Sequence, residues 1–236
     1  GQSTSRNPAV FAVAHVLPSS SATSALVITP TSTTNEYIYG GGFITYENEP
    51  GVELLPPGLS YHFIYCKVGT GGGYGILQVD VFQYSTSWLA TTGVLTDVSY
   101  IDGGANPDKI RRGTGNFLTD GFTDGCQVQV VGGYFDGFWF TVAEVQASDL
   151  ILILGDNPGN FDNAGTNVTI RTQEKLLRRG TSTTFSNTAY QLKMIPYSST
   201  VSDVLDITDR LIFKYWGATS SGTISSISIS TQGTSD

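Results

Sequence analysis

The fold class is decided by a turn and the long strand after it, Leu55-Pro56-Pro57-Gly58 and Leu59-Ser60-Tyr61-His62-Phe63-Ile64-Tyr65-Cys66-Lys67-Val68. The Pro-Pro-Gly turn fixes the chain direction before the strand begins. Alternate side chains of a strand point to opposite faces, so Tyr61, Phe63 and Tyr65 share one face. The opposite face carries Ile64, Cys66 and Val68. Because both faces are largely apolar, we expect this strand to be covered on both sides.

The residues after this strand predict a β-hairpin. A glycine-rich turn at 69–73 leads into the segment 76–84, where Leu77, Val79 and Val81 alternate with Gln78 and Asp80. Two strands joined by a glycine turn form a hairpin. We expect further strands at 9–17, 25–28, 37–46, 128–132, 138–142, 150–154, 189–195, 204–216 and 223–231, and weaker ones at 87–89 and 94–100. Three glycines at 40–42 predict a bulge or bend within the strand there. Only 172–178 allows a short helical turn, because no segment sustains a 3.6-residue period.

The composition independently favours an all-β protein. The 236 residues include 28 Gly, 12 Tyr and 12 Phe, and only 14% are charged. Aromatic and β-branched residues fit a pleated sheet, and Gly, Ser and Asn fit the turns between short strands. The net charge of −8 disfavours charge-driven nucleic-acid binding, because an acidic chain repels phosphates. The sequence has no apolar run of 18 residues and no basic-then-apolar start, so we expect neither a membrane span nor a signal peptide.

The basic residues are unevenly distributed. Seven of the twelve are Lys109, Arg111, Arg112, Arg171, Lys175, Arg178 and Arg179. They lie at or near the two ends of the segment 110–178 and are absent from its middle. We call them the basic seam. Two interpretations stay open: the seam pairs with acidic loops of the same chain or of a neighbour, or it is a solvated junction.

The histidines and cysteines are too few and too scattered for a zinc site, which needs four such ligands. His15 and His62 each lie within an apolar strand, and neither is near a Gly-x-Ser-x-Gly turn. We therefore expect core or interface roles for them instead of a catalytic triad. Cys66 and Cys126 lie in different segments, and we expect two free, buried thiols, with a disulfide between them as the alternative.

The acidic residues offer weak candidates for a catalytic or metal site. Paired carboxylates for glycoside hydrolysis would come from Glu47, Glu49 and Glu53, or from Asp120 and Asp124. All five lie in turn-like loops, where acidic residues are common.

Two aromatic residues and one loop complete the candidates. Tyr46 and Phe122 lie beside these carboxylates and could stack on sugars. The loop from Asp156 to Asn163 offers Asp and Asn oxygens for calcium, but it fits no EF-hand spacing, and Asn, Asp, Pro and Gly are ordinary turn residues. We therefore predict no catalytic residue, no cofactor-binding residue and no metal ligand.

A segment from about 110 to 175 differs in pattern from the rest of the chain. It contains Arg111-Arg112-Gly113-Thr114-Gly115-Asn116-Phe117-Leu118-Thr119-Asp120-Gly121-Phe122, Val128-Gln129-Val130-Val131-Gly132, Phe138-Trp139-Phe140-Thr141-Val142 and Leu150-Ile151-Leu152-Ile153-Leu154. This order, a polar start with an Asp-Gly-Phe turn, an aromatic-Thr-Val strand and a Leu-rich strand, resembles a small β module of tailed-bacteriophage structural proteins. The resemblance covers about a quarter of the chain and implies a virion part rather than an enzyme.

The flanking segments carry a second resemblance. The Pro-Pro-Gly turn, the long aromatic strand and the alternating strand are followed much later by Asp206-Ile207-Thr208-Asp209-Arg210-Leu211-Ile212-Phe213-Lys214-Tyr215 and a last Ser/Thr strand. This pattern resembles the jelly-roll domains of phage virion proteins over about 25–100 and 185–232. We predict an all-β chain in which 1–109 and 179–236 form a jelly-roll-like antiparallel β-sandwich. A small β-barrel-like or β-sandwich-like domain is inserted at 110–178.

Together the resemblances imply a non-enzymatic structural component of a tailed-phage virion. The expected role is a capsid decoration (cement) protein, or a tail or baseplate protein, that stabilises the particle through many subunit contacts. The resemblance implies a homo-oligomer such as a trimer, other capsid or tail subunits as partners, and neither nucleic acid nor membrane. The polar arm at 2–7 and the basic seam are the expected contact points. The alternative function is a receptor-binding or carbohydrate-binding adhesin, which an exposed Tyr/Trp platform with few charges would favour.

Overall fold

The computed structural model describes residues 11–13, 25–31, 34–45, 53–153 and 161–230. These residues form strands and loops, so they include no helix that could cross a membrane. The chain divides into two compact units, described separately below. The outer unit is Ala9–Val81 with Leu177–Asp236, and the inserted unit, among the described residues, is Phe82–Leu176. The all-β class expected from the sequence is confirmed.

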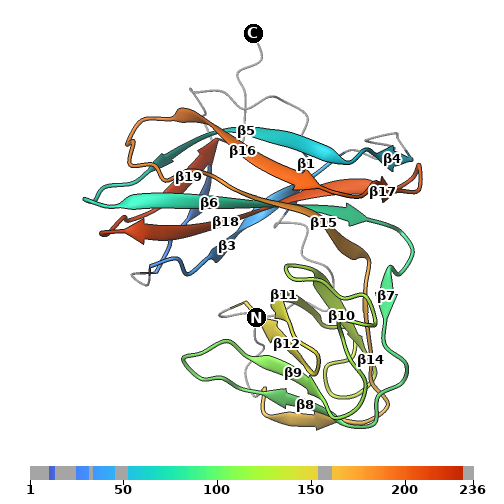
Figure 1. The fold of residues 1–236 in the computed structure, drawn as a ribbon. Coiled ribbons are helices and arrows are strands. Elements are labelled where there is room, and N and C mark those ends of the chain that lie inside the picture. The colour runs from blue at the N-terminus through green and yellow to red at the C-terminus, as the bar shows by residue number, and fades with distance from the viewer. Residues whose placement is uncertain (1–10, 14–24, 32–33, 46–52, 154–160, 231–236) are drawn as a thin grey trace. The chain divides into compact units, whose positions relative to one another are not determined.

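Among the described residues, the outer unit contains eleven strands, most of which the sequence pattern indicated. They are β1 (Phe11–Val13), β2 (Ala25–Ile28), β3 (Ile38–Ile44), β4 (Leu54–Leu55), β5 (Gly58–Val68), β6 (Tyr74–Tyr84), β15 (Glu174–Thr181), β16 (Gln191–Ser199), β17 (Asp203–Val204), β18 (Arg210–Ser221) and β19 (Ile227–Ser230). One sheet has the order β1-β3-β18-β6-β15, a second has the order β16-β5-β19-β2, and β17 pairs with β4. Figure 1 shows β5 and β16 in one layer and β3, β6 and β18 in another.

Side chains from both sheets build one core between these layers. Its buried members are Ile28, Phe43, Ile64, Cys66, Val68, Leu77, Val79, Phe185, Ile195, Tyr215, Ile224, Ile227 and Ile229. Sheets packed face to face bury alternate residues of each strand, so β5 is fully buried at Ile64, Cys66 and Val68. Within one chain only one face of β5 is covered, because Tyr61 and Phe63 on the opposite face are exposed. Cover of this second face by a neighbouring molecule stays a prediction.

The predicted irregularity at the three glycines lies inside a continuous strand. β3 runs through 40–42, and its pairing with β18 shifts register between Tyr215 and Trp216. Gly41 has a φ of 127°, which side chains rarely tolerate, and a Cβ at Gly42 would lie 2.5 Å from the carbonyl oxygen of Phe213. Glycine is therefore required here by backbone conformation and by the close approach of β18.

The inserted unit is built on one antiparallel sheet. Its strands are β7 (Ala90–Thr91), β8 (Val98–Ile101), β9 (Lys109–Arg112), β10 (Gln127–Val131), β11 (Trp139–Val145), β12 (Asp149–Leu152), β13 (Asn163–Gly165) and β14 (Thr169–Thr172). The strand order is β13-β8-β9-β12-β11-β10-β14-β7. A buried cluster of aromatic rings, Tyr100, Phe135, Phe140 and Phe161, packs edge to face with centroids 4.6–5.9 Å apart. Such pairs add stability beyond the area that they bury.

The insertion begins earlier than the sequence pattern placed it. β8 pairs with both β9 and β13, and β7 pairs with β14, so residues from 90 onward are strands of the inserted sheet. The boundary therefore lies near Phe82 instead of 110, and the far boundary, Leu176, lies close to the expected 178. The short strands at 90–101 lack the strong alternation that would have assigned them to this sheet.

Two local predictions need correction. The helical turn allowed at 172–178 is wrong, because β15 occupies Glu174–Thr181. Alternate residues of β15 are buried on one side, and the adjacent Arg178 and Arg179 find different carboxylate partners, which a sheet position allows. The weak strand at 87–89 is also displaced: the strand begins three residues later, at Ala90.

Candidate functional site

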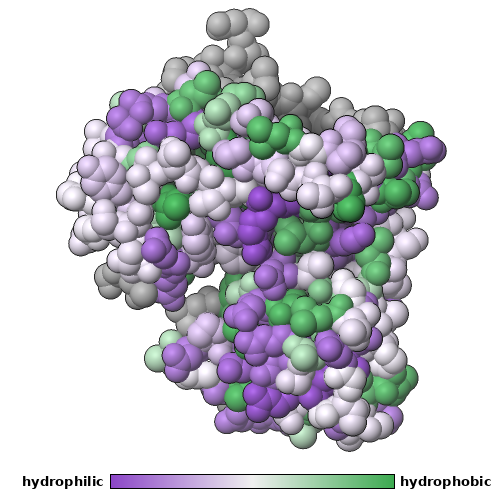
Figure 2. Space-filling view, in the orientation of Figure 1, coloured by the Kyte–Doolittle hydropathy of each residue, from purple (hydrophilic) through white to green (hydrophobic). Residues whose placement is uncertain are grey.

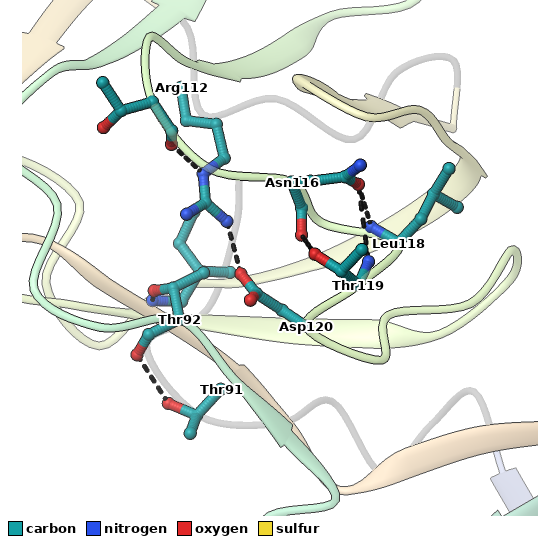
Figure 3. Close-up of polar contacts among 9 residues, drawn as sticks. Thr91, Thr92, Arg112, Asn116, Leu118, Thr119 and Asp120 are labelled. Carbon is teal, nitrogen blue, oxygen red and sulfur yellow. Dashed lines mark hydrogen bonds and ion pairs between the residues drawn. The ribbon is translucent and has the colours of Figure 1, made fainter.

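The loop that carries the phage-module resemblance is a self-contained turn in the inserted unit (Figure 3). The Asn116 side-chain oxygen accepts hydrogen bonds from the backbone N–H groups of Leu118 and Thr119, at 2.8 and 3.4 Å. The Thr119 hydroxyl donates to the carbonyl oxygen of Asn116 at 3.0 Å. These local bonds satisfy the turn's own backbone and leave few groups for a ligand.

Arg112 lies at the centre of this loop and is buried. Its guanidinium donates to Asp120 and to the carbonyl oxygen of Thr114, and it lies 4.9 Å from the centre of the Phe117 ring. Gly115 has a φ of 86°, and a Cβ there would collide with the guanidinium. The Arg-Gly-Thr-Gly-Asn pattern therefore encodes a folded turn around a buried cation.

Most of the basic seam is engaged within its own unit. Arg111 pairs with Asp149 at 2.7 Å, Arg112 with Asp120, Arg178 with Asp203 at 3.4 Å and Arg179 with Asp80 at 2.7 Å. The Arg111 hydrogen bonds hold the pKa of Asp149 below its ordinary value. Pairing with acidic groups of the same chain is therefore the interpretation that holds for these four residues.

His62 is a half-buried residue of the outer unit that contacts aromatic side chains. Its Nε2 lies 2.9 Å from the Tyr215 hydroxyl, and its ring stacks on Phe213 with centroids 5.2 Å apart. Burial lowers the pKa of His62 to about 4, so the ring is neutral at pH 7. The sequence predicted a core or interface role for both histidines, and His62 packs among aromatic rings at the edge of the core; His15 lies outside the described residues.

Neither cysteine forms a disulfide and both are buried, as expected. Cys66 belongs to the outer unit and Cys126 to the inserted unit. Burial raises the pKa of the Cys66 thiol to about 12, which suppresses the reactive thiolate. Each cysteine therefore packs as a small apolar residue.

The candidate carboxylates are not brought together. Asp120 pairs with Arg112, and Asp124 accepts a hydrogen bond from the Val145 N–H at 2.7 Å. Glu53 is exposed, and Glu47, Glu49 and Tyr46 lie outside the described residues. Phe122 is buried, so its proposed stacking on a sugar is wrong.

The candidate calcium loop is only partly described. Its residues 156–160 lie outside the described ranges, while Asp162 accepts a hydrogen bond from the Asp102 N–H at 3.1 Å. Within the described ranges, no group of three or more His, Cys, Asp or Glu side chains is arranged to hold a metal ion.

Two tryptophan rings, a glutamine amide and an arginine guanidinium lie in a row across one face of the inserted sheet. No pattern in the sequence indicated this row. Register places Gln129 beside Trp139 on one side and beside Arg171 on the other. The Arg171 guanidinium lies 3.8 Å from the centre of the Trp88 ring and donates to Gln129 at 2.9 and 3.1 Å. Trp88 and Trp139 stack with centroids 6.2 Å apart, and Trp88 is partly exposed. We call these four residues the tryptophan row.

The most unusual surface belongs to the outer unit. Cross-strand pairs between β5 and β16 put Tyr65 beside Leu192, Phe63 beside Met194, Tyr61 beside Pro196 and Leu59 beside Ser198. Five large side chains of this set, Leu59, Tyr61, Phe63, Leu192 and Met194, are between 44% and 60% exposed. We call Leu59, Tyr61, Phe63, Tyr65, Leu192, Met194 and Pro196 the open face. None of these seven residues is charged, and the next residue on the same side of β5, Lys67, holds its ammonium 4.7 Å from the centre of the Tyr190 ring.

The apolar surface continues along the two neighbouring strands. β4 comes just before β5 in the chain, and β17 comes just after β16. The two short strands pair with each other beyond the paired ends of β5 and β16. Leu54 and Val204, paired across this short ladder, and Val201 in the connecting turn are exposed as well. Figure 2 shows green side chains gathered at the end of the unit where β4 and β17 lie in Figure 1. An exposed apolar surface of this extent is typical of a contact with another molecule.

Comparisons with models of known families, with curated proteins and with solved structures find no match to this chain.

Proposed function

We propose that this chain is a structural component of a tailed-phage virion, with a non-enzymatic role as a capsid decoration protein or a tail or baseplate protein. The observation that carries the proposal is the open face of β5 and β16. Large apolar side chains there remain in contact with water although the strand's other face is fully buried. A particle protein works by burying such surfaces against its neighbours in many copies.

Two further features support a structural role. The loop with the phage-module resemblance is held by its own hydrogen bonds, which suits a rigid scaffold more than a mobile binding loop. Arg111 and Arg179 likewise form ion pairs with buried carboxylates on neighbouring strands of their own unit. The open face therefore stands out as the surface available for assembly.

Purified particles of the phage that carries the gene provide the test. Density-gradient fractions are analysed by quantitative mass spectrometry, with the major capsid protein as the internal standard. The proposal expects peptides of this chain to sediment with intact particles in tens or more copies, and labelled antibodies to locate it on the capsid or the tail. Its absence from washed particles would overturn the proposal.

The second candidate, a carbohydrate-binding adhesin, is favoured by the tryptophan row. Trp88 is partly exposed, and Gln129 and Arg171 offer hydrogen-bonding groups beside it. Aromatic rings beside amide and guanidinium groups suit a sugar ring. However, Arg171 already covers part of Trp88, so less of that ring is open for stacking.

A glycan array separates the two candidates. The adhesin function expects selective binding that is lost on Trp88→Ala and kept on Tyr134→Ala, which changes another exposed aromatic residue of the same unit. Binding to no glycan, or equal loss in both variants, would remove this candidate.

A further inference from the structure

The partner of the open face follows from its composition. The chain carries a net charge of −8, so two copies repel each other through most of their charged surface. None of the seven residues of the open face is charged. A second copy that approaches through these seven residues therefore meets no acidic group among them, and it supplies the same aromatic and aliphatic side chains.

The exposed area is sufficient for a pair of copies. Large side chains bury about 150–250 Å² each, so a half-exposed one leaves about 100 Å² open. Five such side chains offer about 500 Å² per copy, at the upper range of apolar patches on monomers. Two copies packed face to face would bury about 1,000 Å² through these side chains alone, which is about the smallest area expected of a specific interface.

The edge of the same sheet favours packing through the face rather than pairing through the edge. β16 is the edge strand in the order β16-β5-β19-β2. Pro196 lies in the middle of β16, where it lacks the N–H that an added strand would need. The edge of the sheet therefore disfavours the addition of another strand, while the face beside it remains apolar.

We propose that two copies of this chain associate through the open face about a two-fold axis. This proposal rests on the proposed function as a multi-copy assembly protein and specifies which surface joins the copies. Tyr61 and Phe63 of β5 in one copy pack against Leu192 and Met194 of β16 in the other. A two-fold contact uses the same patch twice, and this arrangement places a polarisable methionine sulfur against aromatic rings.

Sedimentation velocity of the full chain between about 1 and 100 μM tests the proposal. Wild type is expected to change from monomer to dimer across this range. The variant Phe63→Thr/Met194→Thr is expected to need about a hundredfold higher concentration, since each 1.4 kcal/mol lost weakens association tenfold. Thr keeps the β propensity of both positions, and Met194→Thr alone, with about a tenfold effect, serves if the double variant does not fold.

Tyr74→Thr is the matched control, because Tyr74 is a half-exposed residue on another strand of the same unit. It should leave association unchanged. A wild type that stays monomeric at 100 μM, a trimer in place of a dimer, or equal weakening by Tyr74→Thr and the open-face variants would overturn the proposal. If the chain is monomeric but is found in purified particles, the proposed interface is overturned and the proposed function stands. If the chain is a dimer but is absent from particles, the interface stands and the proposed function is overturned.

Discussion

The two units treat aromatic residues in opposite ways. The inserted unit encloses Tyr100, Phe135, Phe140 and Phe161 in an edge-to-face cluster that is almost fully buried. The outer unit leaves Tyr61 and Phe63 half exposed on a regular strand, beside Leu192 and Met194. The exposed set lies on the regular antiparallel strands β5 and β16, so poor folding does not account for it. The inserted unit thus encloses this aromatic cluster, although single residues such as Val94, Leu118 and Tyr134 are exposed there, whereas the outer unit leaves a continuous apolar face of β5 and β16 exposed.

The largest expected effect comes from the centre of the closed cluster. Phe135→Ala should lower the free energy of unfolding of the inserted unit by about 3–5 kcal/mol, because it leaves a cavity among four packed rings. The neighbouring Tyr134 is exposed, so Tyr134→Ala should cost about 1 kcal/mol or less. Urea denaturation followed by the fluorescence of Trp88 and Trp139 measures both. Equal effects of the two changes would mean that the cluster is not the closed core described above.

The second prediction concerns a buried carboxylate of the outer unit and its arginine partner. Asp80 is fully buried and receives two hydrogen bonds from Arg179. Arg179→Met should cost about 3 kcal/mol, because it leaves a buried carboxylate without its cation. The double variant Asp80→Val/Arg179→Met should recover most of this loss. Trp216 fluorescence reports the transition in the outer unit, and a loss that the double variant does not recover would contradict the pairing.

The third prediction concerns pH and the inner side of β5. The pKa of His62 is lowered to about 4 in the folded chain, whereas an unfolded histidine titrates near 6.5. As the pH falls from 6.5 to 4, the unfolded chain binds a proton at His62 that the folded chain does not. The free energy of unfolding should therefore fall by about 2–3 kcal/mol over this window and lose nothing more from His62 below it.

His62→Gln isolates this effect, because glutamine keeps a hydrogen-bonding group near Tyr215 and does not titrate. The stability difference between wild type and His62→Gln should shrink as the pH falls from 7 to 4. A difference that is constant with pH would show that His62 titrates normally in the fold.

The smallest expected effect on folding comes from the open face itself. Phe63→Thr should change the free energy of unfolding of the monomer by about 1 kcal/mol or less, because the Phe63 ring is already half exposed. Denaturation at a concentration below the dimer range measures this. A loss as large as that of Phe135→Ala would mean that Phe63 is a core residue and that the two units do not differ in this way.

The sequence predicted most of the strands because alternation is a local property. The segment 76–84 alternates, and 59–68 is rich in aromatic and aliphatic residues after a Pro-Pro-Gly turn; both are long strands of the outer unit. The sequence-based prediction failed where strand pairing decides the structure. The segment 90–101 joins the inserted sheet by pairing with β9, β13 and β14. The predicted helical turn at 172–178 is mostly part of β15, whose arginines pair with carboxylates far away in the sequence. The apolar residues of both faces of β5 were visible in the sequence, but which face remains exposed depends on the packing of the second sheet. The tryptophan row was missed because its members are 41 to 83 residues apart from Trp88 and meet only through strand register.

Met194 allows the most direct measurement of the central claim, because it is the only methionine in the sequence and lies on the open face. Methionine labelled with ¹³C at its methyl group gives one NMR signal from this position, which is recorded over a dilution series. If two copies pack through the open face, the signal should move with concentration as the aromatic rings of the second copy approach it, and it should become shielded from a soluble paramagnetic agent. A signal that keeps its position and its exposure up to 100 μM would contradict the account.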